Sequence, residues 1–484
     1  MERRLEELSA LEIGELVNKR EITPTEVVKY FYNRISLFNN DINVFTYTKL
    51  DEALERAKNI EKRLENGEFV GQFAGVPFAL KDFLPSKKGW TNTKGGVKSL
   101  TDIDDHDSEF CKAMEKAGGI ALGKTNAPAF GFRGTTDNKL YGSTKNPFNL
   151  KYNSGGSSGG SAAAVSSGLI PIAEGGDAGG SIRIPAAWCN LFGFKPSVGL
   201  IPSVSRPDAW AATHPYCFNG GLTKTVEDAA VLLNLMTVYN PRDPLSVPLP
   251  KIDYSEDMKK PINGFKIAFT FDFDIFEVEE EIRDIIFKSA KLLEQAGVTV
   301  DLVHFNIKHS RQEIEEVWCR AISVDAAIEF ELNKDLYDRC GDELPPQFIE
   351  YNKKAASGNI MDYYKFNLVR TDILDAIEEV FENYDIIISP TTCCLPVKNS
   401  DDTVGPKQIN GKPFNELIGF AQTYITNFTG HPSASIPAGF SKNGLPIGMQ
   451  IIGKKYHDSD VFKVAYNYEQ LNPWSDKYKY NNFK

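Results

Sequence analysis

Residues 153–199 read NSGGSSGGSAAAVSSGLIPIAEGGDAGGSIRIPAAWCNLFGFKPSVG and contain eleven of the 38 glycines of this 484-residue chain. All eight residues from Ser154 to Ser161 are glycine or serine. Glycine is needed where the backbone takes a positive φ or comes very close to another group. Two clusters of glycine and serine therefore predict backbone amides gathered around a reacting group.

Two known glycine-rich motifs fit this stretch poorly. A phosphate-binding loop has lysine directly after its last glycine, whereas Ser161 follows Gly160. Residues 155–159 match the G-x-S-x-G pattern of a nucleophile elbow, but an elbow follows a buried strand and residues 146–154 are polar and turn-like. Neither motif explains the stretch.

A flexible linker is the remaining simple interpretation, and the flanking residues argue against it. Residues 162–169 are good helix formers and residues 182–194 are apolar, whereas a linker would be polar throughout. The sequence therefore predicts two serine-bearing turns held by buried structure, at 155–158 and 179–181.

A serine hydroxyl is a poor nucleophile at neutral pH and needs a base. Histidine is the usual base, but none of the six histidines lies in a glycine-rich or apolar turn. We expect all six at the surface or in packing roles: His106, His214, His304, His309, His431 and His457.

Lys81 is the better candidate for the base. The apolar run 76–80 is typical of a buried strand and places Lys81 at its end. Complete burial lowers a lysine pKa by up to ~3–5 units, which leaves the amine neutral. A lysine paired with the adjacent Asp82 at a strand end remains the alternative.

Three separate motifs follow one another in a fixed order along the chain: GVPFALKD at 75–82, GGSSGGS at 155–161 and GGSIRIPA at 179–186. They resemble those of the amidase signature family. The resemblance continues through Lys195-Pro196 and residues 432–450, so that it covers almost the whole chain.

The resemblance implies an α/β fold with three α/β/α layers around a large, mixed central β-sheet. It also implies a single domain spanning residues 1–484. Within it we expect a helical layer at 1–66, a catalytic core at 67–240 and, at 262–484, the rest of the sheet with the helices of the substrate pocket.

The resemblance also assigns a Ser-cisSer-Lys triad. Ser181 would be the acylated nucleophile, Ser157 the bridging serine after a cis Gly156–Ser157 bond, and Lys81 the base. The backbone amides of four residues would bind the oxyanion: Asp177, Ala178, Gly179 and Gly180.

Weaker assignments concern residues around the triad. Ser158 and Arg183, with Asp177, would orient the catalytic groups, or would form an ordinary cap and a buried ion pair. Asn126, Trp318 and Cys319 are candidates for the substrate pocket, with core packing as the alternative.

The resulting hypothesis is a cofactor-free and metal-free enzyme that hydrolyses a small-molecule amide. Its main rival is the catalytic subunit of a tRNA-dependent amidotransferase, which uses the same triad. Residues 127–132 read APAFGF where that subunit has DEFAMG, and Arg183-Ile-Pro185 replaces its Arg-Gln-Pro. Both departures favour a free-standing amidase, similar to broad-specificity and nylon-oligomer hydrolases.

Two further function classes make distinct predictions. A catalytically dead member acting as a binding protein would lack a triad residue, and all three are present. An α/β-hydrolase esterase would depend on a histidine instead of Lys81.

Composition limits the partners and the compartment. A net charge of −11 and a pI near 5.3 argue against nucleic acid or an anionic membrane as a partner. Seven cysteines without paired C-x-x-C spacing predict reduced thiols in the cytoplasm and no zinc site. We expect no signal peptide and no membrane-spanning segment, and the resemblance allows a homodimer.

Hydrophobic periodicity predicts the main elements, with residues 1–66 forming an outer layer of helices. Helices are expected at 24–32, 51–65, 108–117, 226–238, 279–295, 313–332 and 363–382. Besides the strand that ends at Lys81, strands are expected at 120–122, 265–271, 298–305, 385–389, 433–436 and 447–452.

Overall fold

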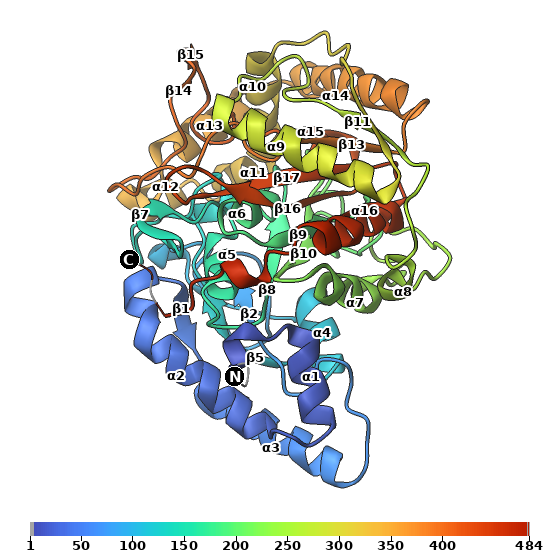
Figure 1. Ribbon diagram of the computed structural model, residues 1–484. Helices are drawn as coiled ribbons and strands as arrows, with labels where there is room; N and C mark the ends of the chain where they lie inside the picture. Colours follow the sequence, from blue (N-terminus) through green and yellow to red (C-terminus); the bar gives the residue numbers. More distant parts are fainter. Residues whose placement is uncertain (1–3, 482, 484) are drawn as a thin grey trace.

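The computed structural model describes residues 4–481 and 483, and its centre is one mixed 11-stranded β-sheet (Figure 1). Apart from the edge strand formed by residues 45–48, which pairs antiparallel with its neighbour, neighbouring strands are parallel toward both edges and antiparallel in the middle. From one edge to the other the order is β1 (Phe45–Thr48), β5 (Ile120–Thr125), β2 (Pro77–Lys81), β8 (Ile172–Asp177), β10 (Phe218–Thr223), β9 (Phe192–Lys195), β16 (Ser433–Phe440), β17 (Pro446–Gly453), β13 (Ile386–Pro390), β11 (Lys266–Phe269) and β12 (Thr299–Leu302).

Three small two-stranded sheets and a set of α-helices surround the central sheet. The small sheets are β3 (Thr91–Asn92) with β4 (Asp102–Ile103), β6 (Lys145–Asn146) with β7 (Asn149–Asn153), and β14 (Gln408–Ile409) with β15 (Lys412–Pro413). The helices are α1 (Ala10–Asn18), α2 (Pro24–Ile42), α3 (Leu50–Glu65), α4 (Glu109–Lys116), α5 (Gly159–Ser166), α6 (Arg183–Trp188), α7 (Val226–Met236), α8 (Tyr254–Asp257), α9 (Glu280–Leu292), α10 (Arg311–Ile322), α11 (Val324–Leu332), α12 (Leu336–Cys340), α13 (Pro346–Ser357), α14 (Ile360–Phe381), α15 (Tyr424–Thr429) and α16 (Asp458–Leu471).

Two adjacent glycines in β10 show that helices cover both faces of the sheet. A Cβ on Gly221 would meet Leu232 of α7 and Phe110 of α4, whereas a Cβ on Gly220 would meet Ile182 next to α6. Successive strand residues point to opposite faces. Helices α4 and α7 therefore lie on one face and α6 on the other, which confirms the three-layer α/β/α fold.

The N-terminal helices form a layer at one end of the molecule, the blue segment of Figure 1. Thr23 caps α2 with a capping box completed by Glu26, and α2 continues to Ile42, ten residues beyond the predicted end. A second difference is β1, which pairs with β5 at the edge of the central sheet. This strand was not predicted within the helical layer expected at 1–66, because four residues are too few for a periodicity to be read.

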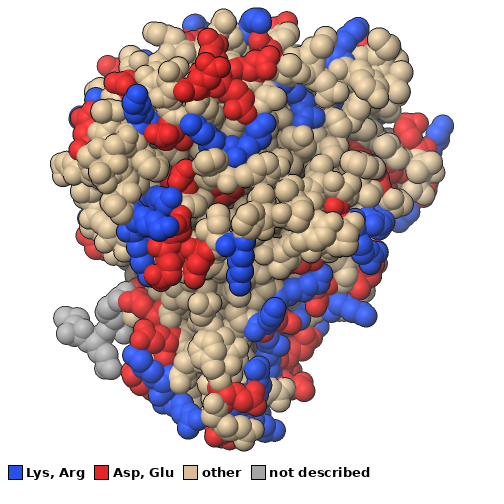
Figure 2. All heavy atoms as spheres, turned by 90° about the vertical axis from the view of Figure 1, so that its right-hand side faces the viewer, with Lys and Arg blue, Asp and Glu red and all other residues tan. Residues whose placement is uncertain are grey.

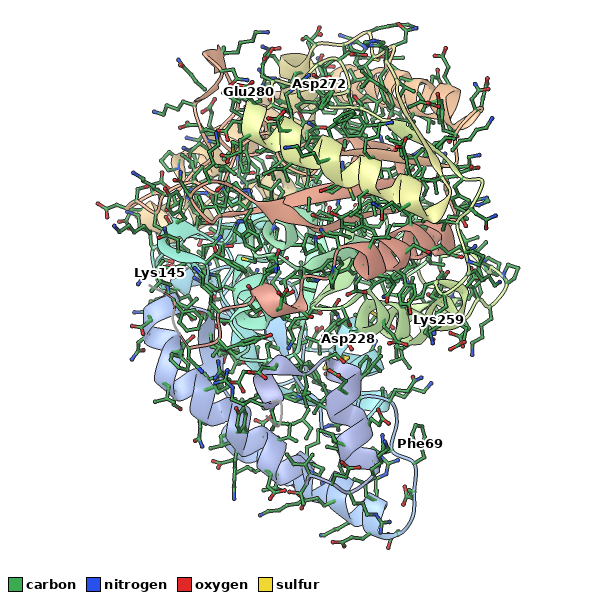
Figure 3. The ribbon with its side chains drawn as sticks, viewed as in Figure 1. Phe69, Lys145, Asp228, Lys259, Asp272 and Glu280 are labelled. Carbon is green, nitrogen blue, oxygen red and sulfur yellow. The ribbon has the colours of Figure 1, made fainter. Side chains whose placement is uncertain are left out.

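Asp228 ties this N-terminal layer to the rest of the fold (Figure 3). It projects from α7 and is fully buried. Its carboxylate oxygens accept the backbone N–H groups of Ala10 and Leu11 at 3.0 and 2.9 Å. These amides open α1 and have no partner within the helix, so a side chain from the core satisfies them.

The second half of the chain contains the predicted β-α-β unit. Strand β11, helix α9 and strand β12 follow one another, and β11 and β12 pair in parallel. The strands predicted near residues 386, 433 and 447 are also present, as β13, β16 and β17. Together they extend the sheet that begins with the N-terminal strands.

Basic and acidic side chains are interspersed over the face shown in Figure 2. Within residues 4–481 and 483, no helix combines the length and the apolar character needed to cross a membrane.

Candidate active site

Strand β2 ends at Lys81, in the middle of the first half of the sheet. The side chain is 5 % exposed, and its Nζ lies 2.7 Å from Ser157 Oγ as a hydrogen-bond donor. The neighbouring Asp82 instead accepts hydrogen bonds from the backbone and hydroxyl of Thr93, at 2.9 and 2.7 Å. The alternative of a Lys81–Asp82 pair is therefore wrong, because Thr93 engages the carboxylate.

Burial gives Lys81 an unusual protonation equilibrium. Desolvation lowers its pKa from 10.5 to about 7, although the negative charges of Glu174 and Asp177 act in the opposite direction. A substantial fraction of neutral amine is therefore present at neutral pH. Neutral Lys81 can accept a proton from the serine that it contacts.

Ser157 lies in the first glycine-serine turn, after a cis Gly156–Ser157 peptide bond. The turn leaves no room for larger side chains, since a Cβ on Gly156 would lie 2.4 Å from the carbonyl oxygen of Thr135. The Ser158 amide donates to the carbonyl oxygen of Ser181 at 3.1 Å. This bond joins the two serine-bearing turns directly.

Ser181 lies in the second turn, between the end of β8 and the start of α6, and its side chain is partly accessible. Packing on both sides requires glycine before it. A Cβ on Gly180 would lie 1.9 Å from Thr423 Oγ1, and one on Gly179 would lie 2.5 Å from the Trp318 ring. Within the described residues, Ser181 Oγ forms no hydrogen bond with the protein.

The backbone amides of this turn differ in their partners. The Gly180 amide donates to Asp177 Oδ1 at 2.8 Å. Among the described residues, the amides of Ala178, Gly179 and Ser181 have no protein acceptor. The Asp177 carboxylate thus already engages the Gly180 amide, which was among the predicted oxyanion donors, and the free amides include that of Ser181 itself.

Asp177 and Arg183 form a fully buried ion pair behind the turn, at 2.9 Å. Burial alone would raise the pKa of Asp177, but the charge and hydrogen bonds of Arg183 outweigh it and hold this pKa at about 2. The pair is thus both a buried ion pair and a support for the turn. The guanidinium also reaches Thr423, Thr426, Asn427, Ser433 and Gln450.

Ser158 and the three predicted pocket residues occupy different surroundings. Ser158 Oγ contacts the backbone of Gly176 at 3.3 Å. Trp318 Nε1 donates to the carbonyl oxygen of Ala178 at 3.0 Å, so its indole lies against the nucleophile turn. Asn126 instead holds the loop 142–144, where it donates to Gly142 and Thr144. Cys319 is fully buried.

Several residues around the site were not singled out from the sequence. Thr423 Oγ1 donates to the carbonyl oxygen of Gly179 at 2.5 Å, and Asn427 Nδ2 donates to the Asp177 carboxylate at 2.9 Å. Both come from α15 and the residue before it, where no motif marks them. Glu174 was not singled out either, but it differs from Thr423 and Asn427. A charged residue between apolar residues of a strand is a signal that can be seen in the sequence.

The histidines occupy surface or packing positions, as predicted. His106, His304 and His457 are exposed and His214 and His309 are partly exposed. His431 is fully buried, and its ring stacks on Phe381 with 5.3 Å between the ring centroids.

One cluster on and before α4 has the composition of a metal site. Ligand atoms of Asp107, Cys111 and Glu115 lie within 4.8 Å of one another. Glu115, however, already pairs with Lys87 at 2.7 Å, and burial raises the pKa of the Cys111 thiol well above its ordinary value. We assign no metal to this cluster.

Comparison with known proteins places this geometry in a family. Residues 26–462 match the family model described as Amidase. An acylamidase of Rhodococcus erythropolis is 31% identical over 98% of both chains. A glutamyl-tRNA(Gln) amidotransferase subunit of Geobacillus stearothermophilus is 33% identical over 96% of both. The crystal structure of a bacterial aryl acylamidase superimposes with a TM-score of 0.94, at 41% identity and over 97% of both chains. The chain therefore belongs to the amidase signature family, whose enzymes hydrolyse amide C–N bonds.

Proposed function

We propose that this chain is a free-standing amidase that hydrolyses a small carboxylic amide through an acyl-enzyme on Ser181. The observation that carries the proposal is the 2.7 Å hydrogen bond between Lys81 Nζ and Ser157 Oγ in a buried site. A buried lysine with a pKa of about 7 is suited to act as a general base near neutral pH.

In the proposed reaction, Ser181 Oγ attacks the amide carbonyl carbon. Its proton passes to Ser157 Oγ as the proton of Ser157 passes to Lys81 Nζ. The relay then returns a proton to the nitrogen as the C–N bond breaks, because an amine leaves readily only when protonated. Water cleaves the resulting ester and releases the carboxylate. The two serine hydroxyls, both within the described residues, form no hydrogen bond with each other in this structure, and the proposed relay requires them to come within hydrogen-bond distance when substrate binds.

The unpartnered amides of the nucleophile turn would stabilise the oxyanion formed during attack. We assign this role to the amides of Ala178, Gly179 and Ser181. One donor of this kind contributes about 3–4 kcal/mol to lowering the barrier. The Asp177–Arg183 pair would keep the turn in place while the charge develops.

Aromatic side chains around the catalytic groups favour an apolar or aromatic amide. Phe83 lies with its ring centroid 5.4 Å from Lys81 Nζ, and Trp318 packs against Gly179. A Cβ on Gly131, next to Phe130, would lie 3.2 Å from Ser157 Oγ. The likeness to an aryl acylamidase supports the same substrate class.

The alternative is the catalytic subunit of a tRNA-dependent amidotransferase, which the similarity to such subunits supports. The altered motif at residues 127–132 argues against it. A single-domain organisation, a cytoplasmic location and a homodimer remain predictions.

The decisive test is amine or ammonia release from a panel of anilides, aliphatic amides and glutamine, without partner subunits. We expect the wild type to hydrolyse anilides, and Ser181→Ala and Lys81→Ala to lose this activity. Ser166→Ala, a change at a buried serine of α5, is the control and should retain it. In a second assay, partner subunits would be added. If glutamine were then the only substrate hydrolysed, and only in their presence, the result would favour the amidotransferase.

A further inference from the structure

Glu174 is an acid in the middle of the central sheet. It belongs to β8, between β2 and β10, and is 7 % exposed. Its neighbours Ile172, Ala173 and Gly175 are typical of a buried strand. Burying a carboxylate is unfavourable unless hydrogen bonds or charges compensate, so its contacts indicate why it is there.

The Glu174 carboxylate contacts the backbone of the proposed base. Its Oε2 accepts the Lys81 backbone N–H at 3.1 Å, and its Oε1 accepts the Ser108 hydroxyl at 2.5 Å. The pairing of β2 with β8 covers only Phe78 and Ala79. Where that pairing ends, the Glu174 side chain takes the place of a backbone acceptor and holds the end of β2.

Charged and titratable groups from four other segments surround this carboxylate. Lys81 faces it from β2, Lys124 from β5, and Asp104 and Cys111 from the segment leading into α4 and from α4 itself. Burial raises the pKa of Glu174 to about 7, against the opposing effects of its hydrogen bonds and of Lys124. Lys81, which also faces Asp177, changes charge in the same pH range.

We propose that Glu174 is a positioning residue for Lys81: its carboxylate accepts the backbone N–H of the base where the pairing of β2 with β8 ends, and so fixes the place of the amine. The inference rests on the proposed function, because it assumes that neutral Lys81 is the base. When Glu174 is ionised, its charge also favours the protonated amine and raises the pH at which the base becomes neutral.

The test compares the pH dependence of kcat/KM for amide hydrolysis in the wild type and in Glu174→Gln. Glutamine keeps the shape and an oxygen acceptor for the Lys81 amide but removes the charge. We expect the acidic limb to move down by at most about one pH unit, because Glu174 is itself partly protonated near pH 7, with the rate on the alkaline plateau little changed. An unmoved limb, or a rate lowered equally at every pH, would overturn the inference.

Two further variants separate charge from structure. Glu174→Asp keeps the charge and shortens the side chain, so the limb should stay near that of the wild type while kcat falls. A limb that moves as far as in Glu174→Gln would contradict the role of the charge. The control is Glu469→Gln, because Glu469 also accepts a backbone N–H, that of Val226, and burial also raises its pKa, to about 8. Its limb should not move.

Failure of the proposed function has a different signature. A wild type without an acidic limb, or a Lys81→Ala variant that keeps full activity, would overturn the role of Lys81 and this inference with it. A normal wild-type limb that Glu174→Gln leaves in place overturns the inference alone.

Discussion

Lys81 combines two properties that conflict in most proteins, a charged side-chain type and complete burial at the end of a strand. Desolvation lowers its pKa to about 7, so the amine loses its proton near the pH at which a base is needed. Ser157 Oγ, 2.7 Å away, is positioned to give up a proton to it. The proposed chemistry thus depends on the environment of one nitrogen atom.

This environment predicts the pH dependence of the rate. If neutral Lys81 is the base, kcat/KM should be constant above its pKa and fall about tenfold per pH unit below about pH 7. The measurement is kcat/KM for an anilide between pH 5 and pH 9, with circular dichroism at each pH to show that the protein stays folded. A rate that rises toward acid would contradict the assignment.

Burial of Lys81 should also destabilise the fold. Because folding lowers this pKa, the folded state loses, between about pH 7 and pH 10.5, a proton that the unfolded state keeps. The resulting decrease in the free energy of unfolding is largest below pH 7 and disappears near pH 10.5. Replacing Lys81 by Met should therefore abolish activity and raise the free energy of unfolding at pH 7, on the order of 2 kcal/mol. Urea unfolding measures this difference. A variant less stable than the wild type would contradict it.

At the scale of elements, the nucleophile turn joins the end of β8 to the start of α6 and is supported from behind. Asp177 and Arg183 are fully buried, and Thr423 and Asn427 bind the same turn from the α15 side. Asp177 engages the Gly180 amide, which fixes the direction of the remaining amides. We therefore expect support of the turn and the proposed chemistry at Ser181 to be coupled.

Asp177→Asn tests this coupling. The change leaves the Arg183 guanidinium buried without its counter-charge, which costs about 3–5 kcal/mol of stability. We expect a lower midpoint in chemical unfolding and a reduced kcat. Glu68→Gln, which breaks the exposed Arg63–Glu68 pair, is the control and should change stability by less than about 1 kcal/mol. Equal effects of the two variants would refute the proposed support.

At the scale of the whole molecule, strands from both halves of the chain complete one sheet, and the N-terminal helices are attached to it by side chains. Asp228 accepts the first two amides of α1. Lys224, which precedes α7, donates to the carbonyl oxygens of Glu6 and Leu8. The start of α1 is therefore one of several attachments of the N-terminal layer, since Arg34 of α2 also donates to the carbonyl oxygens of Ser167 and Gly168 and β1 pairs with β5.

Asp228→Ala should loosen this attachment without changing the catalytic groups. Loss of the carboxylate leaves the Ala10 and Leu11 amides buried and unpaired, and we expect stability to fall by about 2 kcal/mol. Hydrogen exchange in residues 10–18 should accelerate while kcat/KM stays near that of the wild type. Asp253→Ala, which removes the cap of the short helix α8, is the control and should leave exchange in α1 unchanged.

The motifs led to much of the site, and their limits have physical reasons. Lys81, Ser157 and Ser181 lie in recognisable patterns, and two of these residues contact each other as expected. The engagement of the Gly180 amide could not be predicted, because it depends on where the Asp177 side chain points. Strand β1 was missed because four residues carry too little periodicity, and Glu174 because residues 172–177 were not predicted as a strand, so that this acid did not stand out as a buried charge.

The most direct test of the central claim is the identity of the acylated residue. The enzyme would be incubated with an activated ester whose acyl group hydrolyses slowly, quenched in acid and digested, and the peptides analysed by mass spectrometry. We predict the added acyl mass on Ser181 in the wild type and its absence in Ser181→Ala. Turnover without an adduct on Ser181, or an acyl group on Ser157 or a cysteine instead, would contradict the account.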